Sequence, residues 1–398
     1  MSENGSSKKQ RKTSKGYKPT REESALDVSS EPRERIALRM TVSLRRDPQV
    51  AVRHRCLTHT GLLANLVLTS LNLGDGQNLG TANGKIALDC SVRRTRQGHY
   101  CISTTDFFFP LVDSPYLQGR IGAANVLSDL YAEGVGECDF VLMLLAACRD
   151  MTEDDRNICT REMVRGFNDA CLEAGTTVTG GQTVLNPWPV IGGVATTICS
   201  DGEFVKSDGA QVGDVVVLTK PLGTQVAVNV HEWRVRGTPK WKELTNRSIL
   251  SREEAEDMMH AAVCSMSRLN RHGGGLMVKH HAHAGTDVTG FGLVGHAQNL
   301  MDNQAAEVGM ELHTLPCIAN TVKVEQSGVF DFRLLKGYSA ETSGGLMICM
   351  KEDDARRYCE ELELLDGEKA WIIGRVIADP DRKARIVEGI KILEVGLS

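Results

Sequence analysis

The feature that most limits how this chain can fold is a polar stretch near its middle, SDGEFVKSDGAQVGD (200–214). Glycine, aspartate and serine gathered between two periodic regions are typical of a connection between domains. On either side, short β-branched runs such as PVIGGVATTIC (189–199) and VVVL (215–218) alternate with longer segments of helical period. The pattern predicts two domains that each mix strands and helices, which is an α/β or α+β fold.

The beginning of the chain differs in composition from the rest. Its first residues are rich in Lys, Ser, Arg and Glu and have no apolar periodicity, which is typical of a disordered tail. An organelle transit peptide is the alternative, but the acidic residues Glu3, Glu22 and Glu23 argue against it. The predicted limits are 1–35 for the tail, 36–84 for a divergent segment of uncertain structure, 85–205 for an N-terminal α/β domain and 206–398 for a C-terminal α+β domain.

Overall composition excludes several classes of partner. The 398 residues carry a formal net charge of -5, so there is no electrostatic case for nucleic acid or an anionic membrane. The longest apolar runs, such as FVLMLLAAC (140–148), are well short of the about 18 residues that a membrane span needs. Twelve cysteines are scattered without C-x-x-C spacing, so we expect reduced thiols and a cytoplasmic protein.

Three segments indicate particular elements. HYCISTTDFFFP (99–110) predicts a strand that ends at Asp106, before a Phe-Pro stop. SPYLQGRIGAANVLSDLYAEGV (114–135) predicts a helix with one apolar stripe. In the second half, Ser251 has capping-box spacing for a helix that the glycines 273–275 would end.

Four aspartates stand at element boundaries in separate segments. They are Asp89 (IALDCSV), Asp106 (STTDFFFP), Asp129 (NVLSDLYAEG) and Asp287 (GTDVTGFG), and Asp129 follows Asn125 by one helical turn, which puts both side chains on one face. Magnesium takes oxygen ligands and usually bridges carboxylates to substrate phosphates, so these aspartates are candidate ligands. The structural alternatives are caps for Asp106 and Asp287, a solvated helix position for Asp129 and a strand edge for Asp89.

Other short motifs add less. In TVTGGQT (177–183) a Gly-Gly turn after a strand would expose backbone N–H groups to a phosphate or an adenine edge. There is no G-x-x-x-x-G-K-[ST], and the glycines Gly290, Gly292 and Gly295 follow no clean apolar strand, so neither a P-loop nor a dinucleotide fold is predicted. The histidines of KHHAH (279–283) lack cysteine or carboxylate at ligand spacing, which favours a helix surface over zinc.

Longer stretches resemble a known family, the selenophosphate synthetases (selenide, water dikinases), within the wider group that includes aminoimidazole ribonucleotide synthetase. The similarity extends from about Lys85 to Val395, and TGGQTVLNPW resembles the eukaryotic branch in particular. The most specific segments are ISTTDFFFPLVDSPYLQGRIGAANVLSDLYAEGV (102–135), TGGQTVLNPW (179–188), LTKPLGTQVAV (218–228), TDVTGFGLVGHAQNL (286–300) and ETSGGLMIC (341–349).

The resemblance implies a two-domain architecture like that of aminoimidazole ribonucleotide synthetase and a homodimer in which the N-terminal sheets of two subunits form a barrel. It implies synthesis of selenophosphate from ATP, selenide and water, releasing AMP and phosphate, for selenocysteine formation. It implies Mg²⁺ and leaves open a monovalent cation. By the same resemblance, residues 85–205 form the ATP-binding domain. The implied metal ligands are Asp89, Asp129 and Asp287, and the implied ATP-binding residues are Asp89, Asp106, Asp129, Gly180, Gly181, Gln182 and Thr183.

One expected feature of the family is missing. A Gly-rich segment with Cys or selenocysteine close to a Lys is expected within residues 36–60, where LRRDPQVAVRHRCLTHTG stands instead. Cys56 is the only cysteine upstream of the domain, and it has neither flanking glycines nor a nearby lysine, so no catalytic nucleophile is identified. Either the chain is a paralogue that binds ATP or regulates a true synthetase, or residues 36–84 derive from a shifted reading frame or a misassigned exon. A sister activity on a purine or carbamoyl substrate is a third possibility.

Overall fold

The computed structural model describes residues 17–20 and 89–396, and its first sheet comes from the N-terminal half. Its strands lie in the order β1-β2-β5-β3-β4, and β3 and β4 form the parallel pair that the crossover helix α6 connects. The five strands are β1 (Ser91–Arg94), β2 (Tyr100–Phe108), β3 (Phe140–Cys148), β4 (Val178–Asn186) and β5 (Val190–Cys199).

The second sheet comes from the C-terminal half. Its strands lie in the order β11-β8-β10-β6-β9-β7, and the pairing is antiparallel except between β11 and β8. The six strands are β6 (Val215–Leu218), β7 (Ala284–Asp287), β8 (Val308–Ile318), β9 (Leu346–Met350), β10 (Trp371–Ala378) and β11 (Ala384–Val395). Two sheets with helices in each half confirm the predicted α/β (α+β) class, while the domain limits stay predictions.

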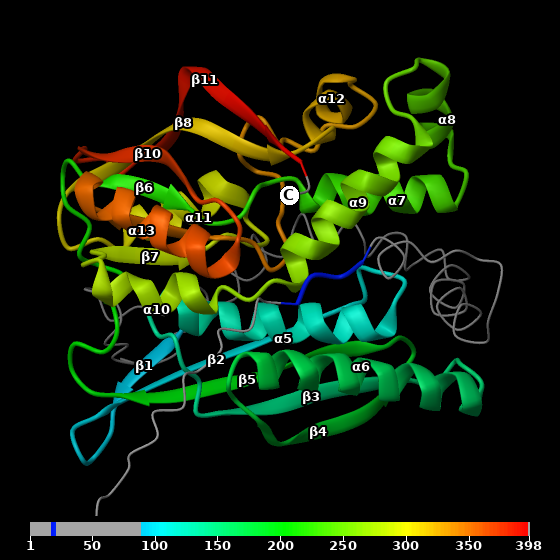
Figure 1. Cartoon of the computed structure of the whole chain (residues 1–398), viewed down its shortest axis with the longest axis horizontal. Coiled ribbons are helices and arrows are strands. Elements are labelled where there is room, and N and C mark those ends of the chain that lie inside the picture. Colours follow the sequence, from blue (N-terminus) through cyan, green and yellow to red (C-terminus); the bar gives the residue numbers. More distant parts are fainter. Residues whose placement is uncertain (1–16, 21–88, 397–398) are drawn as a thin grey trace, which may run out of the picture.

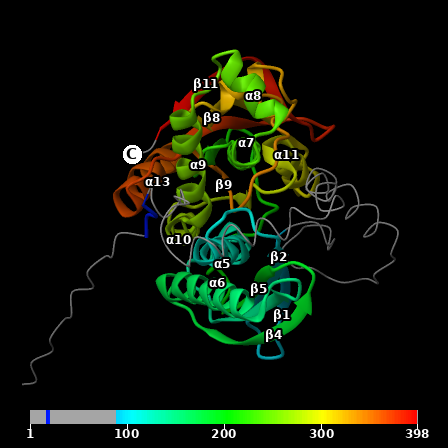
Figure 2. The same ribbon diagram turned by 90° about the vertical axis from the view of Figure 1, so that its right-hand side faces the viewer.

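Helices cover one face of the first sheet and surround the second (Figures 1 and 2). They are α5 (Pro115–Ala132), α6 (Glu153–Glu173), α7 (Thr224–Val235), α8 (Pro239–Asn246), α9 (Arg252–Ser267), α10 (Arg271–Lys279), α11 (Gly292–Asp302), α12 (Thr321–Gln326) and α13 (Glu352–Asp366). Within the described ranges, none of them is both long and apolar enough to cross a bilayer.

Helix α5 lies between the two halves of the chain. It packs on α6 and β5 on one side and on α9, α10 and β7 on the other (Figure 1). The predicted helix is confirmed, and its apolar stripe is buried together with every other residue from 117 to 132. A helix surrounded by protein has no solvent face to keep polar. Gly119 also lets α6 come close, because a Cβ there would overlap the carbonyl oxygen of Met163.

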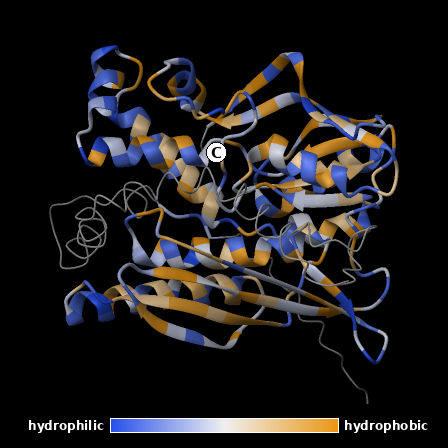
Figure 3. Ribbon diagram, turned by 180° about the vertical axis from the view of Figure 1, so that it is seen from behind, coloured by the Kyte–Doolittle hydropathy of each residue, from blue (hydrophilic) through white to orange (hydrophobic). Residues whose placement is uncertain are grey.

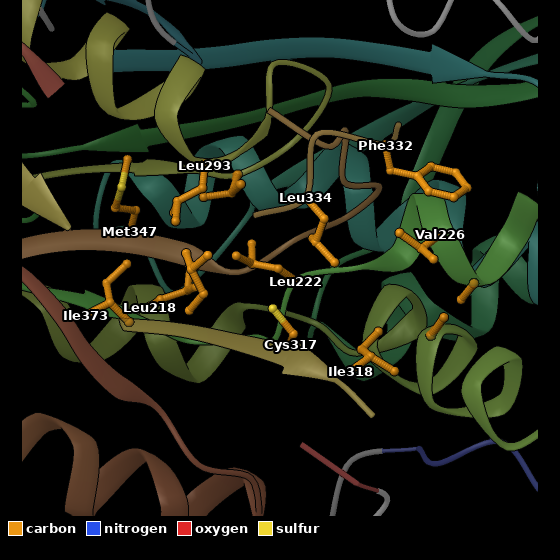
Figure 4. Close-up of a cluster of buried hydrophobic side chains, with 14 of the residues drawn as sticks. Leu218, Leu222, Val226, Leu293, Cys317, Ile318, Phe332, Leu334, Met347 and Ile373 are labelled. Carbon is orange, nitrogen blue, oxygen red and sulfur yellow. The ribbon is translucent and has the colours of Figure 1, made fainter. Parts of the chain in front are cut away.

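Two clusters of buried apolar side chains form the core. One fills the C-terminal half, where Leu218 and Leu222 pack with Leu293 and Cys317 (Figure 4). The other joins the halves: Val141, Ile191 and Phe167 share it with the residues Leu276, Met277, Leu346 and Tyr358. Because apolar side chains from both sides of the polar stretch share one core, the two halves are held in a fixed relation.

Two predicted boundaries were wrong. Strand β2 continues two residues beyond Asp106 to Phe108, because it stays paired with β5 along its whole length. Helix α9 begins with the expected capping box, but it ends at Ser267, and the glycines 273–275 lie inside the next helix, α10. Gly274 is there for close packing, since a Cβ would come within 2.7 Å of the carbonyl oxygen of Tyr131 in α5.

A short piece of the predicted tail is described, and it contacts both halves. The guanidinium group of Arg120 lies over the ring of Tyr17, 3.9 Å from its centroid. Lys18 forms an ion pair of 2.7 Å with Glu368 in the C-terminal half. The divergent segment, with Cys56, lies outside the described residues.

Candidate functional site

Three of the four aspartates meet between the two halves of the chain. Asp89 lies just before β1, Asp129 lies in α5, and Asp287 is the last residue of β7. One carboxylate oxygen from each lies within 4.8 Å of the others. Asp129 and Asp287 are buried and Asp89 is partly buried, so they occupy neither the cap nor the solvated positions considered as alternatives.

The fourth aspartate is tied to the same helix through β2. Thr104 donates a hydrogen bond to Asp129, and the amide of Asn125 donates to Asp106 at 2.7 Å. These two contacts are possible together because the spacings match. Two residues along the strand, from Thr104 to Asp106, advance about 6.6 Å, and four residues along the helix, from Asn125 to Asp129, advance about 6 Å. Alternate side chains of β2 therefore match successive turns of α5, and Asp106 lies one helical turn from Asp129.

Burial and mutual repulsion make these carboxyl groups hard to ionise. Burial, followed by the charge of Asp287, raises the pKa of Asp106 to about 7. Burial also raises the pKa of Asp287 to about 6, opposed by a hydrogen bond from Ser128 and by the charge of Lys220. The pKa values of Asp89 and Asp129 are raised well above the usual range, mainly by burial. Metal-free, the cluster is thus an unfavourable concentration of negative charge.

The donor atoms fit a hard cation. One carboxylate oxygen of Asp89 and one of Asp287 are buried without a hydrogen-bond partner in the described part of the chain. Buried polar atoms are rarely left unpaired, and carboxylate oxygens are the ligands that Mg²⁺ prefers. Asp89, Asp129 and Asp287 could therefore hold magnesium, and a phosphate-bearing ligand could complete its coordination.

Two further segments run beside this cluster, 219–224 from the end of β6 to the first residue of α7, and 341–346 up to the first residue of β9; we call them the paired loops. Their backbones are joined where Thr219 N–H donates to the carbonyl oxygen of Leu346 at 3.1 Å. The carboxylate of Glu341 accepts the N–H groups of Gly223 and Thr224, at 2.7 and 2.9 Å, and so caps α7, which has no cap of its own.

The second of the paired loops also borders the aspartate strand β7. Val288 N–H donates to the carbonyl oxygen of Gly345 at 2.9 Å, and Glu341 N–H donates to that of Thr289 at 2.9 Å. Burial raises the pKa of Glu341 to about 7, opposed by its hydrogen bonds to the start of α7. The segments LTKPLG, TDVTG and ETSGG therefore form one layer against the carboxylates.

Lys220 lies inside this layer and is almost fully buried. Its ammonium group donates to the carbonyl oxygens of Arg268 and Ser343, at 2.7 and 2.8 Å. Burial lowers the pKa of Lys220 well below the usual range, and Asp287 acts in the opposite direction. A cation placed here offsets part of the negative charge of the aspartates.

Comparison with known proteins identifies the family. AIR synthase related protein models match the chain, the N-terminal domain over residues 87–199 and the C-terminal domain over 211–387. The chain is 49% identical over 335 residues to the selenide, water dikinase of Dictyostelium discoideum, covering 82% of this chain and 89% of that protein. It is 49% identical over 314 residues to selenide, water dikinase 2 of Homo sapiens, covering 78% and 69%. The chain belongs to the selenide, water dikinase family.

Solved structures of other proteins share the fold of this selenide, water dikinase family member. Thiamine monophosphate kinase from Aquifex aeolicus superposes with a TM-score of 0.56 at 18% identity, covering 78% of this chain and 93% of that one. Hydrogenase maturation protein HypE in complex with ATP gives a TM-score of 0.54 at 17% identity, covering 75% and 85%. At this identity the likeness shows the fold alone.

In this family member the GGQT residues lie away from the aspartates. Gly180, Gly181, Gln182 and Thr183 lie within β4, so the predicted Gly-Gly turn was wrong. Gly181 serves close strand pairing instead, because a Cβ would overlap the backbone of β3. In the sheet register Gly181 shares a row with Asp106, but β5 and β3 lie between, so about 14 Å separates them.

The histidines also have separate partners rather than a shared metal. His280 is paired with Glu361 at 2.9 Å and His283 with Asp214 at 2.8 Å. Within the described ranges the aspartate cluster is the one group that has the spacing of a metal site.

Sequence reasoning missed Lys220, Glu341 and Ser343. A lysine and a glutamate next to apolar strands are a weak signal, because most such residues lie on the surface. What makes them functional candidates is pairing between loops that are distant in the chain, as in the bond from Lys220 to Ser343, which periodicity cannot reveal.

Proposed function

We propose that this chain catalyses the synthesis of selenophosphate from ATP, selenide and water, releasing AMP and phosphate, for selenocysteine formation. The observation that carries the proposal is the meeting of Asp89, Asp129 and Asp287 between the halves, with a buried carboxylate oxygen of Asp89 and one of Asp287 that have no hydrogen-bond partner among the described residues. The name selenide, water dikinase of the relatives supplies the substrate. Selenide is nucleophilic at neutral pH, so the protein chiefly positions the reactants and neutralises the phosphates.

In this proposal Asp89, Asp129 and Asp287 hold Mg²⁺, which supplies charge neutralisation to the phosphate groups when bound. Thr104 and Asn125 fix the orientation of Asp129 and Asp106 by their hydrogen bonds. Asp106 lies at the edge of the cluster, where it would contact the nucleotide. A requirement for a monovalent cation stays an open part of the proposal.

The GGQT residues contact the nucleotide of a partner subunit in a homodimer, according to the same proposal. Asp106 points towards α5, on the helix-covered face of the first sheet. A nucleotide bound beside Asp106 therefore cannot reach the GGQT residues of β4 in the same subunit, because β5, β3 and α6 lie between them. No helix of the described residues covers the opposite face or the β4 edge, and the strands of this sheet are rich in hydrophobic residues (Figure 3). The exposed large hydrophobic residues on the strands of this sheet are Phe107, Val184, Leu185 and Ile198. Such a surface is typical of an interface between subunits.

The reaction is tested by incubating the full chain with ATP, MgCl₂ and selenide under anaerobic conditions. We expect AMP by chromatography and a phosphorus–selenium signal by ³¹P NMR, both dependent on selenide. Nucleotide binding without AMP would point to a non-catalytic partner of a synthetase, and selenide-independent ATP consumption to a sister activity on another substrate.

The homodimer is tested separately by light scattering. We expect Val184→Asp to convert a dimer to a monomer, because it puts a charge on a residue that is 50% exposed on β4 and whose register places it on the face away from α5, which a partner sheet would cover. Leu364→Asp, at an 86% exposed position on α13, is the matched control and should leave the dimer intact. A wild-type monomer would contradict the proposal. We further propose a cytoplasmic location, in keeping with the free thiols of the cysteines in the described residues.

A further inference from the structure

Two family-specific segments, LTKPLG and ETSGG, supply no ligand to the proposed metal. They form the paired loops, which lie beside β7 and its final residue Asp287. One of the connections between them is the hydrogen bond from the Lys220 ammonium group to the carbonyl oxygen of Ser343. Gly345 allows this approach, because a Cβ there would meet the Cβ of Lys220 at 3.0 Å.

Lys220 is a cation without a carboxylate partner. An ammonium group has three N–H donors, and the described structure gives two of them carbonyl acceptors, on Arg268 and Ser343. Within the described residues no Asp or Glu oxygen lies within 4 Å of it, although the charges of Asp287 and Asp366 favour its ammonium form, and burial and the charge of Arg268 oppose it. A buried charge held only by neutral carbonyl groups is costly, and a nearby anion would offset that cost.

Ser343 is held in an unusual conformation with a free hydroxyl group. Its φ is 47°, a left-handed value that non-glycine residues seldom adopt. Both backbone polar groups are used: its N–H donates to the side-chain oxygen of Asn125 at 3.0 Å, and its carbonyl oxygen accepts from Lys220. The side chain is fully buried, yet its hydroxyl has no hydrogen-bond partner among the described residues.

These two residues combine the properties of an anion-binding pair next to the carboxylates. Asn125 connects Ser343 to Asp106, which itself faces the proposed nucleotide position. Strained backbone and unpaired donors that persist in a buried loop are typical of functional sites, where a ligand supplies the missing acceptor. The negative charge of Asp287 would repel a carboxylate ligand at this position. A phosphate group that also binds the cation held by the aspartates has part of its charge neutralised, so it can bind here.

We propose that Lys220 and Ser343 bind the phosphate groups of the nucleotide, with one Lys220 N–H and the Ser343 hydroxyl donating to non-bridging phosphate oxygens. This rests on the proposed function for the presence of a nucleotide at the aspartates. Lys220 adds positive charge and Ser343 adds a directional donor, and the hydrogen bond between them fixes their separation. The paired loops are then the phosphate-binding part of the site.

The test is calorimetric titration of the full chain with AMPPCP in MgCl₂, without selenide, and with adenosine as a phosphate-free probe. We expect Ser343→Ala to weaken AMPPCP binding about tenfold and Lys220→Met about thirtyfold, in the range for hydrogen bonds to charged groups. Adenosine binding should be unchanged in both variants. Because this titration contains no selenide, its result does not depend on selenophosphate synthesis. A chain that makes no AMP or selenophosphate in the activity assay, but whose AMPPCP binding is weakened by these variants, would refute the proposed function and leave this inference standing.

A matched control separates binding from packing. Ser265 in α9 also has a buried hydroxyl without a partner in the described structure, but it lies outside the paired loops. Ser265→Ala should leave AMPPCP affinity unchanged. The inference is overturned if Ser343→Ala binds AMPPCP as tightly as the wild type, or if adenosine affinity falls by the same factor. Should Lys220→Met fail to fold, Ser343→Ala still decides.

Discussion

Replacing Asp287 by asparagine should make the metal-free protein more stable while weakening its ligand binding. The folded pKa of Asp287 is about 6, against an ordinary value of 3.8. A group whose pKa is raised on folding stabilises the fold below its unfolded pKa and loses that contribution as the pH rises through the folded value. Above pH 7 the loss is complete, and at 1.36 kcal/mol per pKa unit it amounts to about 3 kcal/mol. An asparagine side chain carries no charge, so Asp287→Asn removes this penalty.

The measurement is thermal unfolding at pH 7.5, first in EDTA and then in MgCl₂ with AMPPCP. In EDTA we expect the Tm of Asp287→Asn to exceed that of the wild type by about 5 °C, given the size of the chain. In MgCl₂ with AMPPCP the order should reverse, because the wild type gains binding energy that the variant lacks. Asp381→Asn, at an exposed position, is the control and should change neither Tm. An unchanged or lower Tm of Asp287→Asn in EDTA would refute the cost of burying the ionised Asp287 carboxylate.

Three further predictions concern the same region. Mg²⁺ affinity, measured by titration, should fall about tenfold between pH 8 and pH 5, because Asp287, a proposed ligand whose pKa is about 6, takes up a proton as the pH drops; a flat profile would contradict this. Gly274→Ala should lower the free energy of unfolding in urea by about 2 kcal/mol, since its Cβ would meet the backbone of Tyr131. Gly202→Ala is the control for a general effect of replacing glycine, because there is open space around Gly202; its positive φ adds some strain. Glu341→Gln should cost about 1–3 kcal/mol by urea unfolding, because one of its buried N–H partners loses its acceptor; unchanged stability would mean that α7 needs no such cap.

The sequence allowed prediction of the elements that depend on local pattern. The capping box at Ser251 and the strands at 190–199 and 215–218 were predicted correctly because periodicity and capping are local properties. The Gly-Gly pair of GGQT was wrongly predicted as a turn, because a glycine chosen for close strand pairing looks the same in sequence as one chosen for a turn. The glycines of α10 were misread for the same reason.

The candidate site was only partly visible in the sequence. The aspartates were visible as carboxylates in Thr/Gly surroundings, and their metal and nucleotide roles stay predictions. Lys220 and Ser343 were not visible, since their significance depends on a contact across 123 residues and on a backbone angle. Residues 36–84, where the divergence from the family falls, lie outside the described residues.

The position of α5 has a consequence for how the protein is made. This helix is complete once residue 132 has been synthesised, but α9, α10 and β7, which cover its second side, come from residues 252 to 287. At about 5–20 residues per second on the ribosome, that surface stays uncovered for many seconds. The nascent chain therefore needs protection from aggregation during this interval. An N-terminal fragment expressed alone should aggregate rather than fold independently.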